Sequence, residues 1–222
     1  MPHILDFELI RSHRSSLSLQ INLHGKLVVK APHLMPMFLI NRFVNEKSEW
    51  IDKHLKGVQK SYVNRLEEMQ EGNEFLYLGN LYKLEIGNYK EVTVGDKLYF
   101  PKFLSFRLKK EVTEWYIRQA KKIITQRVIY YSAIMKKNYK SIIYSDTTSK
   151  WGSCSVDNRL QFNWRLIMSS ILVLDYVVVH ELVHTTEKNH RRKFWKEVEK
   201  YKPAYKQYIK WLKENSYRLH SI

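Results

Sequence analysis

Cysteine and glycine are scarce in this chain of 222 residues, which contains one Cys and seven Gly. The single thiol, Cys154, cannot form a disulfide within the chain and cannot build a cysteine-rich zinc ribbon. There is also no internal repeat, low-complexity tract or long Pro/Gly linker. These absences favour a folded protein in a reducing compartment.

Long apolar runs are absent as well. No run approaches the roughly 20 apolar residues that a helix needs to cross a bilayer, and the first residues, "MPHILDFELIRSHR", lack the apolar region of a secretory signal. Hydrophobic residues nevertheless make up 44% of the chain, which is enough to bury a core. We therefore expect a cytoplasmic globular protein without a membrane partner.

Acidic residues are too few to balance the basic ones, since 22 Asp and Glu face 38 Lys and Arg, a net charge of +16. Eleven basic residues face two Glu between Lys102 and Lys140, and ten face two between Lys188 and Lys213. Such a charge attracts nucleic acid or acidic partners, although it also suits a solvated face that aids solubility. Charge alone leaves nucleic-acid binding open.

The first part of the chain alternates between apolar and polar residues. The segments "FELIRS", "SLSLQINL" and "KLVVKAP" predict strands, with a hairpin turn at His24-Gly25. One or two helices should follow Pro36, and then short strands in "EFLYLGNLYKLEIG" and "KEVTVGDKLYF". We expect a β-rich region with one or two helices over residues 1–101 and a second domain over residues 102–222.

The second part changes to helical spacing. A long basic helix is predicted from about Leu104 to Asn138, with an apolar stripe that should face the core, made of Leu108, Val112, Tyr116, Ala120, Ile124 and Val128. Short strands with a turn at Asp157-Asn158 come next, followed by three helices separated near Asn189 and Pro203. The pattern indicates an α+β fold.

The segment "VVVHELVH" carries the strongest chemical signal. His180 and His184 are four residues apart, so a helix projects them from one face with Glu181 beside them. Unpaired polar groups beside a triple-valine wall cost a few kcal/mol each, and a metal ion removes that conflict. Catalytic zinc usually takes three protein ligands. His190 is the candidate for the third, and Glu187 is the alternative.

Several ordered segments extend the signal along nearly the whole chain. They are "RSHRSSLSLQI", "LVVKAP", "SKWGSCSVDNRLQFNWRLI", "LDYVVVHELVH", "NHRRKFWKEVEKYKP" and "KWLKE". In these segments the sequence resembles the YgjP-like metallopeptidase family, described as predicted metal-dependent hydrolases and related to SprT-like zinc peptidases. Two departures are Val183, where relatives often have Cys or Ala, and Lys150, where Arg is usual. Neither is a proposed ligand.

The resemblance implies a minimal zincin fold, with one zinc ion held by His180, His184 and His190. It also implies that Glu181 is the catalytic carboxylate. Zinc would lower the pKa of water toward about 7, and Glu181 would move the proton to the leaving amine. The donor to the oxyanion stays open among Arg165, Tyr176, His220 and a backbone amide.

By analogy with zincins, an extended peptide should pair with an edge strand beside the metal. The segment "NRLQFNW" is the predicted strand, so that Asn163, Trp164 and Arg165 would contact the substrate. Cys154 as a nucleophile is disfavoured, and Asp175 could cap the helix, orient a ligand or serve packing alone.

The sequence thus favours a zinc-dependent hydrolase that cleaves peptide bonds. Two alternatives from other classes are a nucleic-acid-associated protein, including a protease that acts on DNA-bound proteins, and a zinc-binding adaptor without turnover.

Overall fold

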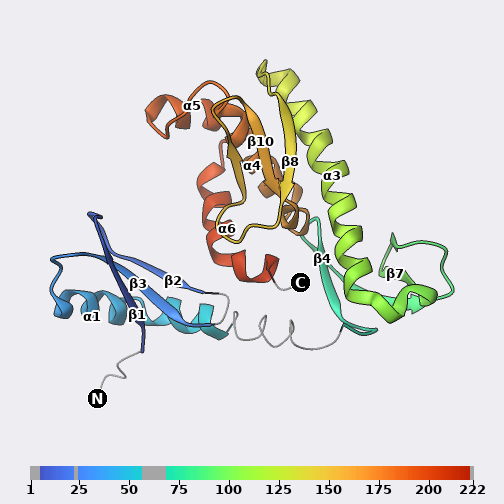
Figure 1. Cartoon of the computed structure of the whole chain (residues 1–222), viewed down its shortest axis with the longest axis horizontal. Helices are drawn as coiled ribbons and strands as arrows, with labels where there is room; N and C mark the ends of the chain where they lie inside the picture. The colour runs from blue at the N-terminus through green and yellow to red at the C-terminus, as the bar shows by residue number, and fades with distance from the viewer. Residues whose placement is uncertain (1–5, 23–24, 57–68, 221–222) are drawn as a thin grey trace. The chain divides into compact units, whose positions relative to one another are not determined.

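The computed structural model describes residues 6–22, 25–56 and 69–220, and it confirms a mixed α+β fold (Figure 1). Backbone contacts divide the chain into two compact units, Met1–Glu67 and Glu68–His220. The boundary that we predicted near residue 101 lies inside the second of these units. Among the described residues, no helix is both long enough and apolar enough to span a membrane.

The first unit contains a three-stranded sheet in the order β1-β3-β2. Its strands are β1 (Glu8–Ser12), β2 (Ser18–Ile21) and β3 (Leu27–Pro32), as the alternating pattern predicts. β3 is central, parallel to β1 and antiparallel to β2. Of the predicted turn, Gly25 has a φ of 77°, which suits glycine, and His24 lies outside the described residues.

One face of this sheet is covered by α1 (Met37–Glu46), and residues 48–56 are also helical. The core between them joins the inward residues of β3 to the helices: Leu27, Val29, Ala31, Ile40, Val44 and Ile51. The alternation of β3 therefore builds a small core of its own.

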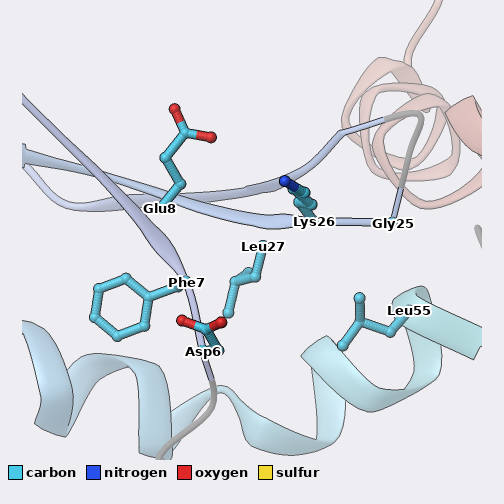
Figure 2. A pocket seen from close by; sticks show the side chains of 7 residues that line it. All are labelled: Asp6, Phe7, Glu8, Gly25, Lys26, Leu27 and Leu55. Carbon is cyan, nitrogen blue, oxygen red and sulfur yellow. The ribbon is translucent and has the colours of Figure 1, made fainter.

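A pocket opens at one end of this sheet (Figure 2). Its lining mixes apolar and charged side chains, namely Asp6, Phe7, Glu8, Gly25, Lys26, Leu27 and Leu55. Figure 2 shows Leu27 and Leu55 between the strands and the helix, with Glu8 pointing to the opposite side of the strands. Because no His or Cys lines it, this pocket is not the metal site that the sequence predicts.

The second unit begins with a four-stranded sheet in the order β4-β5-β7-β6. The strands are β4 (Glu74–Tyr77), β5 (Asn80–Gly87), β6 (Thr93–Val94) and β7 (Leu98–Pro101). Several hydrogen bonds attach this sheet to the rest of the unit, and two of them are short. Leu78 N donates to Ile167 O at 2.8 Å, and Tyr116 Oη donates to Leu76 O at 2.6 Å.

The predicted long helix is α3 (Leu108–Met135), and a 3-10 helix, η1 (Lys102–Arg107), precedes it. Every residue of the predicted apolar stripe from Leu108 to Val128 is buried, which confirms that stripe as core. The helix stops where Lys136 adopts a left-handed φ of 53°.

A second sheet, in the order β8-β10-β9, lies beside α3 (Figure 1). Its strands are β8 (Ser141–Ser145), β9 (Gly152–Cys154) and β10 (Arg159–Asn163). β10 is the central strand, since it is parallel to β8 and antiparallel to β9. The prediction that "NRLQFNW" forms an edge strand is therefore wrong, because β9 and β8 occupy its two sides.

Four helical elements complete the unit: η2 (Trp164–Met168), α4 (Ile171–Val183), α5 (Arg192–Tyr201) and α6 (Tyr205–Leu219). The three predicted helices are thus present. Apart from Asp175, Tyr176, His180 and Glu181, α4 consists of apolar residues, and it packs against α3, α5, α6 and β9. It is the central helix of the unit, and it carries the histidine motif.

Candidate metal centre

Three imidazoles converge at the C-terminal end of α4. His190 Nε2 lies 3.1 Å from His184 Nε2 and 3.1 Å from His180 Nε2, and the candidate ligand atoms of the three residues lie within 4.8 Å of one another. Nitrogens bound at about 2.0–2.1 Å to one tetrahedral zinc ion lie about 3.3 Å apart. The three side chains therefore fit a single small cation.

The chain reaches this geometry by ending α4 immediately after the motif. Thr185 N donates to Leu182 O, Thr186 N donates to Val183 O, and Glu187 N donates to Val183 O. This turn reverses the chain and returns His190 to the two histidines of the helix. The predicted break before α5 is confirmed, and it is what allows a residue six positions beyond His184 to join the cluster.

The outer nitrogens of His180 and His184 have partners that leave their Nε2 atoms turned inward. His184 Nδ1 donates to Glu187 O at 2.9 Å, and Tyr176 Oη lies 3.3 Å from His180 Nδ1. Such contacts fix the tautomer and orientation of a metal-binding imidazole. Glu187 thus supports the cluster through its carbonyl, while its carboxylate pairs with Lys193 at 2.5 Å. The structure groups His190, rather than Glu187, with His180 and His184.

Aromatic packing holds the three rings from behind. The Phe194 ring centroid lies 4.9, 4.5 and 4.7 Å from the ring centroids of His180, His184 and His190. Trp195 adds contacts to His180 and His190 at 5.8 and 5.7 Å. α5 therefore preorganises the cluster by packing.

Burial keeps the helix histidines neutral. Burial, followed by the neighbouring imidazoles, lowers the pKa of His180 to about 3. Burial also lowers the pKa of His184, although the Glu187 carbonyl opposes this effect. Neutral imidazole is the form that binds metal ions. These two side chains can therefore bind a cation at neutral pH without first losing a proton.

Glu181 is the orphaned polar group beside the cluster. Its exposed fraction is 4%, and its Oε2 atom is buried without a hydrogen-bond partner. Burial raises the pKa of this carboxyl to about 8, while the charge of Lys150 opposes the shift. A buried unpaired carboxyl is costly, and a nearby cation or a water molecule would relieve that cost. A buried, unpartnered carboxyl next to His180 is compatible with a metal site that uses a catalytic carboxylate.

Gly152 on β9 makes the space that Glu181 occupies. A Cβ atom at Gly152 would lie 2.6 Å from Glu181 Oε1, 2.7 Å from its Cγ and 2.9 Å from its Cδ. These separations are shorter than van der Waals contact, so only glycine admits the carboxylate here. No sequence pattern predicts this requirement, because the strand and the helix meet only in the tertiary fold.

Asp175 anchors α4 rather than a histidine. Its carboxylate, 3% exposed, accepts hydrogen bonds from Arg127 Nε at 2.6 Å, Tyr131 Oη at 2.9 Å and Lys202 Nζ at 3.0 Å. These donors come from α3 and from the residue after α5. Of the roles left open by the sequence, the structure thus supports a packing role for Asp175.

The residues that we predicted to contact substrate lie away from open surface or are engaged elsewhere. Asn163 and Trp164 are only 1% and 3% exposed, and Asn163 Oδ1 accepts from Arg165 N at 2.9 Å, which starts η2. Arg165 Nε donates to Asp146 Oδ1 at 2.7 Å. Burial and these contacts indicate a structural role for the three residues. Their position in the sequence before the histidine motif did not predict that role.

The remaining candidates take other positions. The Cys154 thiol is partly buried, and burial raises its pKa, which opposes formation of a nucleophilic thiolate. The His220 ring stacks on Trp151 with centroids 5.1 Å apart. Tyr176 Oη faces the outer nitrogen of a histidine, as described above. The sequence pattern indicated the three histidines, which the structure brings together, and Glu181, but it missed Gly152.

Comparison with known proteins agrees with this geometry. A family model described as "YgjP-like, metallopeptidase domain" matches residues 15–215. No curated protein and no solved structure matched the chain.

Proposed function

The chain belongs to the YgjP-like metallopeptidase family, and from this premise we propose that it is a zinc-dependent peptidase with a minimal zincin fold. His180, His184 and His190 would hold the ion through their Nε2 atoms. The observation that carries the proposal is the convergence of these three nitrogens beside a buried, unpartnered carboxyl. A purely structural metal site would not need a buried, unpartnered carboxyl beside the three histidines.

A bound zinc ion would polarise a carbonyl oxygen and lower the pKa of water toward about 7. The other steps belong to the chain. Glu181 Oε2 has no partner in the described residues, and a cation bound nearby would favour the ionised carboxylate. That carboxylate could accept a proton from the attacking water and deliver it to the leaving amine nitrogen. The apolar surroundings of α4 would exclude competing water, and close packing against the backbone of Gly152 would hold the Glu181 carboxyl in place.

The substrate would pair with β9. Asn163 N donates to Trp151 O, and Ser155 N donates to Arg159 O. The main-chain groups of Trp151 and Ser155, which flank β9, therefore face β10. Antiparallel ladders alternate, and the main-chain groups of Gly152 and Cys154 therefore point away from β10. Among the described residues β9 has no second partner strand. An extended peptide added to this edge would lie directly beside Glu181.

Methylation of the peptide provides a test of this pairing. A peptide nitrogen that donates to β9 would lose about one backbone hydrogen bond on methylation, so KM should rise by about 2–10-fold. Because strand pairing has a period of two, methylation at alternate residues should raise KM while methylation at the residues between them does not. Steady-state kinetics on a series of singly methylated peptides measures this. Equal effects at successive positions would contradict pairing with β9.

Metal removal tests the function itself. We expect about one zinc ion per purified chain and slow cleavage of an unfolded protein such as casein. Chelation should abolish cleavage, and added zinc should restore it, because the histidines hold the ion and Glu181 needs it nearby. Elemental analysis and gel-based cleavage measure both quantities. Cleavage that survives complete loss of metal, or a zinc-loaded protein that cleaves no peptide bond, would contradict the proposal.

A further inference from the structure

Two phenylalanines stand exposed at the beginning of the long helix. Phe103 is 64% exposed and Phe106 is 80% exposed, whereas Leu104 and Leu108 of the same segment pack into the core. A 3-10 helix has about three residues per turn, so positions 103 and 106 lie on the same side of η1. The turn therefore directs its leucines inward and presents both rings together to solvent.

Cations surround the two rings. Lys102, Arg107, Lys109 and Lys110 are all exposed, and the Arg107 guanidinium carbon lies 5.5 Å from the Phe106 ring centroid. We call these four residues and the two phenylalanines the aromatic-basic patch. Exposed large apolar side chains that are grouped, rather than scattered, usually mark an interaction surface. Here the surface combines flat π faces with positive charge.

The positive charge continues along α3. Two of the four cations of the patch have acidic neighbours, since Glu111 pairs with Arg107 at 2.8 Å and Glu114 lies 4.0 Å from Lys110, and the cations still outnumber these two Glu. Further along, Arg118, Lys121 and Lys122 are exposed. The twelve helical steps from Lys110 to Lys122 correspond to a rise of about 18 Å. The cations therefore form a line rather than a compact cluster.

We propose that the aromatic-basic patch and this line of cations bind single-stranded nucleic acid. A linear polyanion complements a linear row of cations, and bases stack on aromatic side chains regardless of sequence. Duplex nucleic acid keeps its bases stacked on each other and offers no free faces to the two rings. An acidic protein could also cover the two rings, but its carboxylates do not follow one another along a single chain as phosphates do. The inference does not depend on the proposed peptidase activity, because none of these residues belongs to the histidine cluster.

Fluorescence anisotropy with a labelled oligothymidine of about 20 nucleotides tests this inference. Wild type should bind at low salt. The logarithm of its association constant should fall steeply with the logarithm of the salt concentration. The double variant Phe103→Ser/Phe106→Ser should bind at least about 10-fold more weakly, because base stacking on two rings is lost while the charge is unchanged. The double variant Lys121→Gln/Lys122→Gln should reduce the salt slope by about 1.4, since each phosphate contact contributes about 0.7 on a single strand. A duplex of the same length should bind more weakly than the single strand.

Phe38→Ser is the matched control, since Phe38 is 68% exposed on α1 of the first unit, and it should bind like wild type. All substituted side chains are exposed, and thermal unfolding checks that each variant is folded. Zinc-free protein should bind equally well, which separates this inference from the peptidase proposal. Absence of binding, equal binding by the phenylalanine variant, or tighter binding of the duplex would overturn it. So would Phe-dependent binding to phosphatidylglycerol vesicles without binding to the oligonucleotide, which would assign the patch to membranes.

Discussion

The variant Glu181→Gln is expected to lower kcat/KM for peptide hydrolysis by about 10²–10⁴-fold while the protein retains its zinc. Glutamine has nearly the same size and shape, so the packing around this position, which is 4% exposed, should persist. In glutamine an amide group replaces the carboxylate, whose Oε2 atom has no hydrogen-bond partner, and this amide cannot accept the proton. Steady-state kinetics and elemental analysis of the same preparation measure the two effects.

Two further variants separate the roles of neighbouring residues. His190→Ala should lose zinc and activity together, because it removes one of three converging nitrogens. Glu187→Gln should keep both, because its carboxylate pairs with Lys193 rather than with the cluster. A Glu181→Gln protein that cleaves at the wild-type rate would exclude this residue as the proton carrier. Loss of zinc in Glu187→Gln would instead support the alternative that the Glu187 carboxylate is a zinc ligand.

The variant Gly152→Ala is expected to lower kcat/KM by about 10²-fold with zinc still bound. The added methyl group would lie 2.6 Å from Glu181 Oε1, so the carboxyl must move from its position. A displacement of about 1 Å at a catalytic group can cost that factor. Overpacking of this kind also lowers the free energy of unfolding by about 1–3 kcal/mol. Kinetics, metal analysis and denaturant unfolding measure the three quantities.

Gly95→Ala is the control for this substitution, because its added Cβ would meet only the Tyr99 side chain, at 3.2 Å. Tyr99 lies in the other sheet of the unit and can yield, so activity should not change. Wild-type kinetics in Gly152→Ala would mean that Glu181 tolerates displacement. In that case the carboxyl could not depend on its position for proton transfer.

Local patterns predicted the parts of this fold that depend on short-range physics. The apolar stripe of α3 and the alternation of β3 follow directly from helical and strand periodicity, and both are buried as expected. The four-residue spacing of His180 and His184 fixes their common face as soon as the segment is helical. The predicted start of this helix, about Leu104, precedes the observed start at Leu108, because the residues from Lys102 to Arg107 form a 3-10 helix with a similar periodicity.

The amino-acid sequence by itself determined the residue types of the candidate centre, its three histidines and one glutamate, and the family to which the chain belongs. Only the tertiary structure decided which strand borders that centre. Pairing between strands distant in sequence placed β10 in the middle and β9 at the edge, and no periodicity within either strand carries that information. A second long-range contact, between β9 and α4, brought Gly152 against Glu181, since the space available to a carboxylate depends on the backbone that packs beside it.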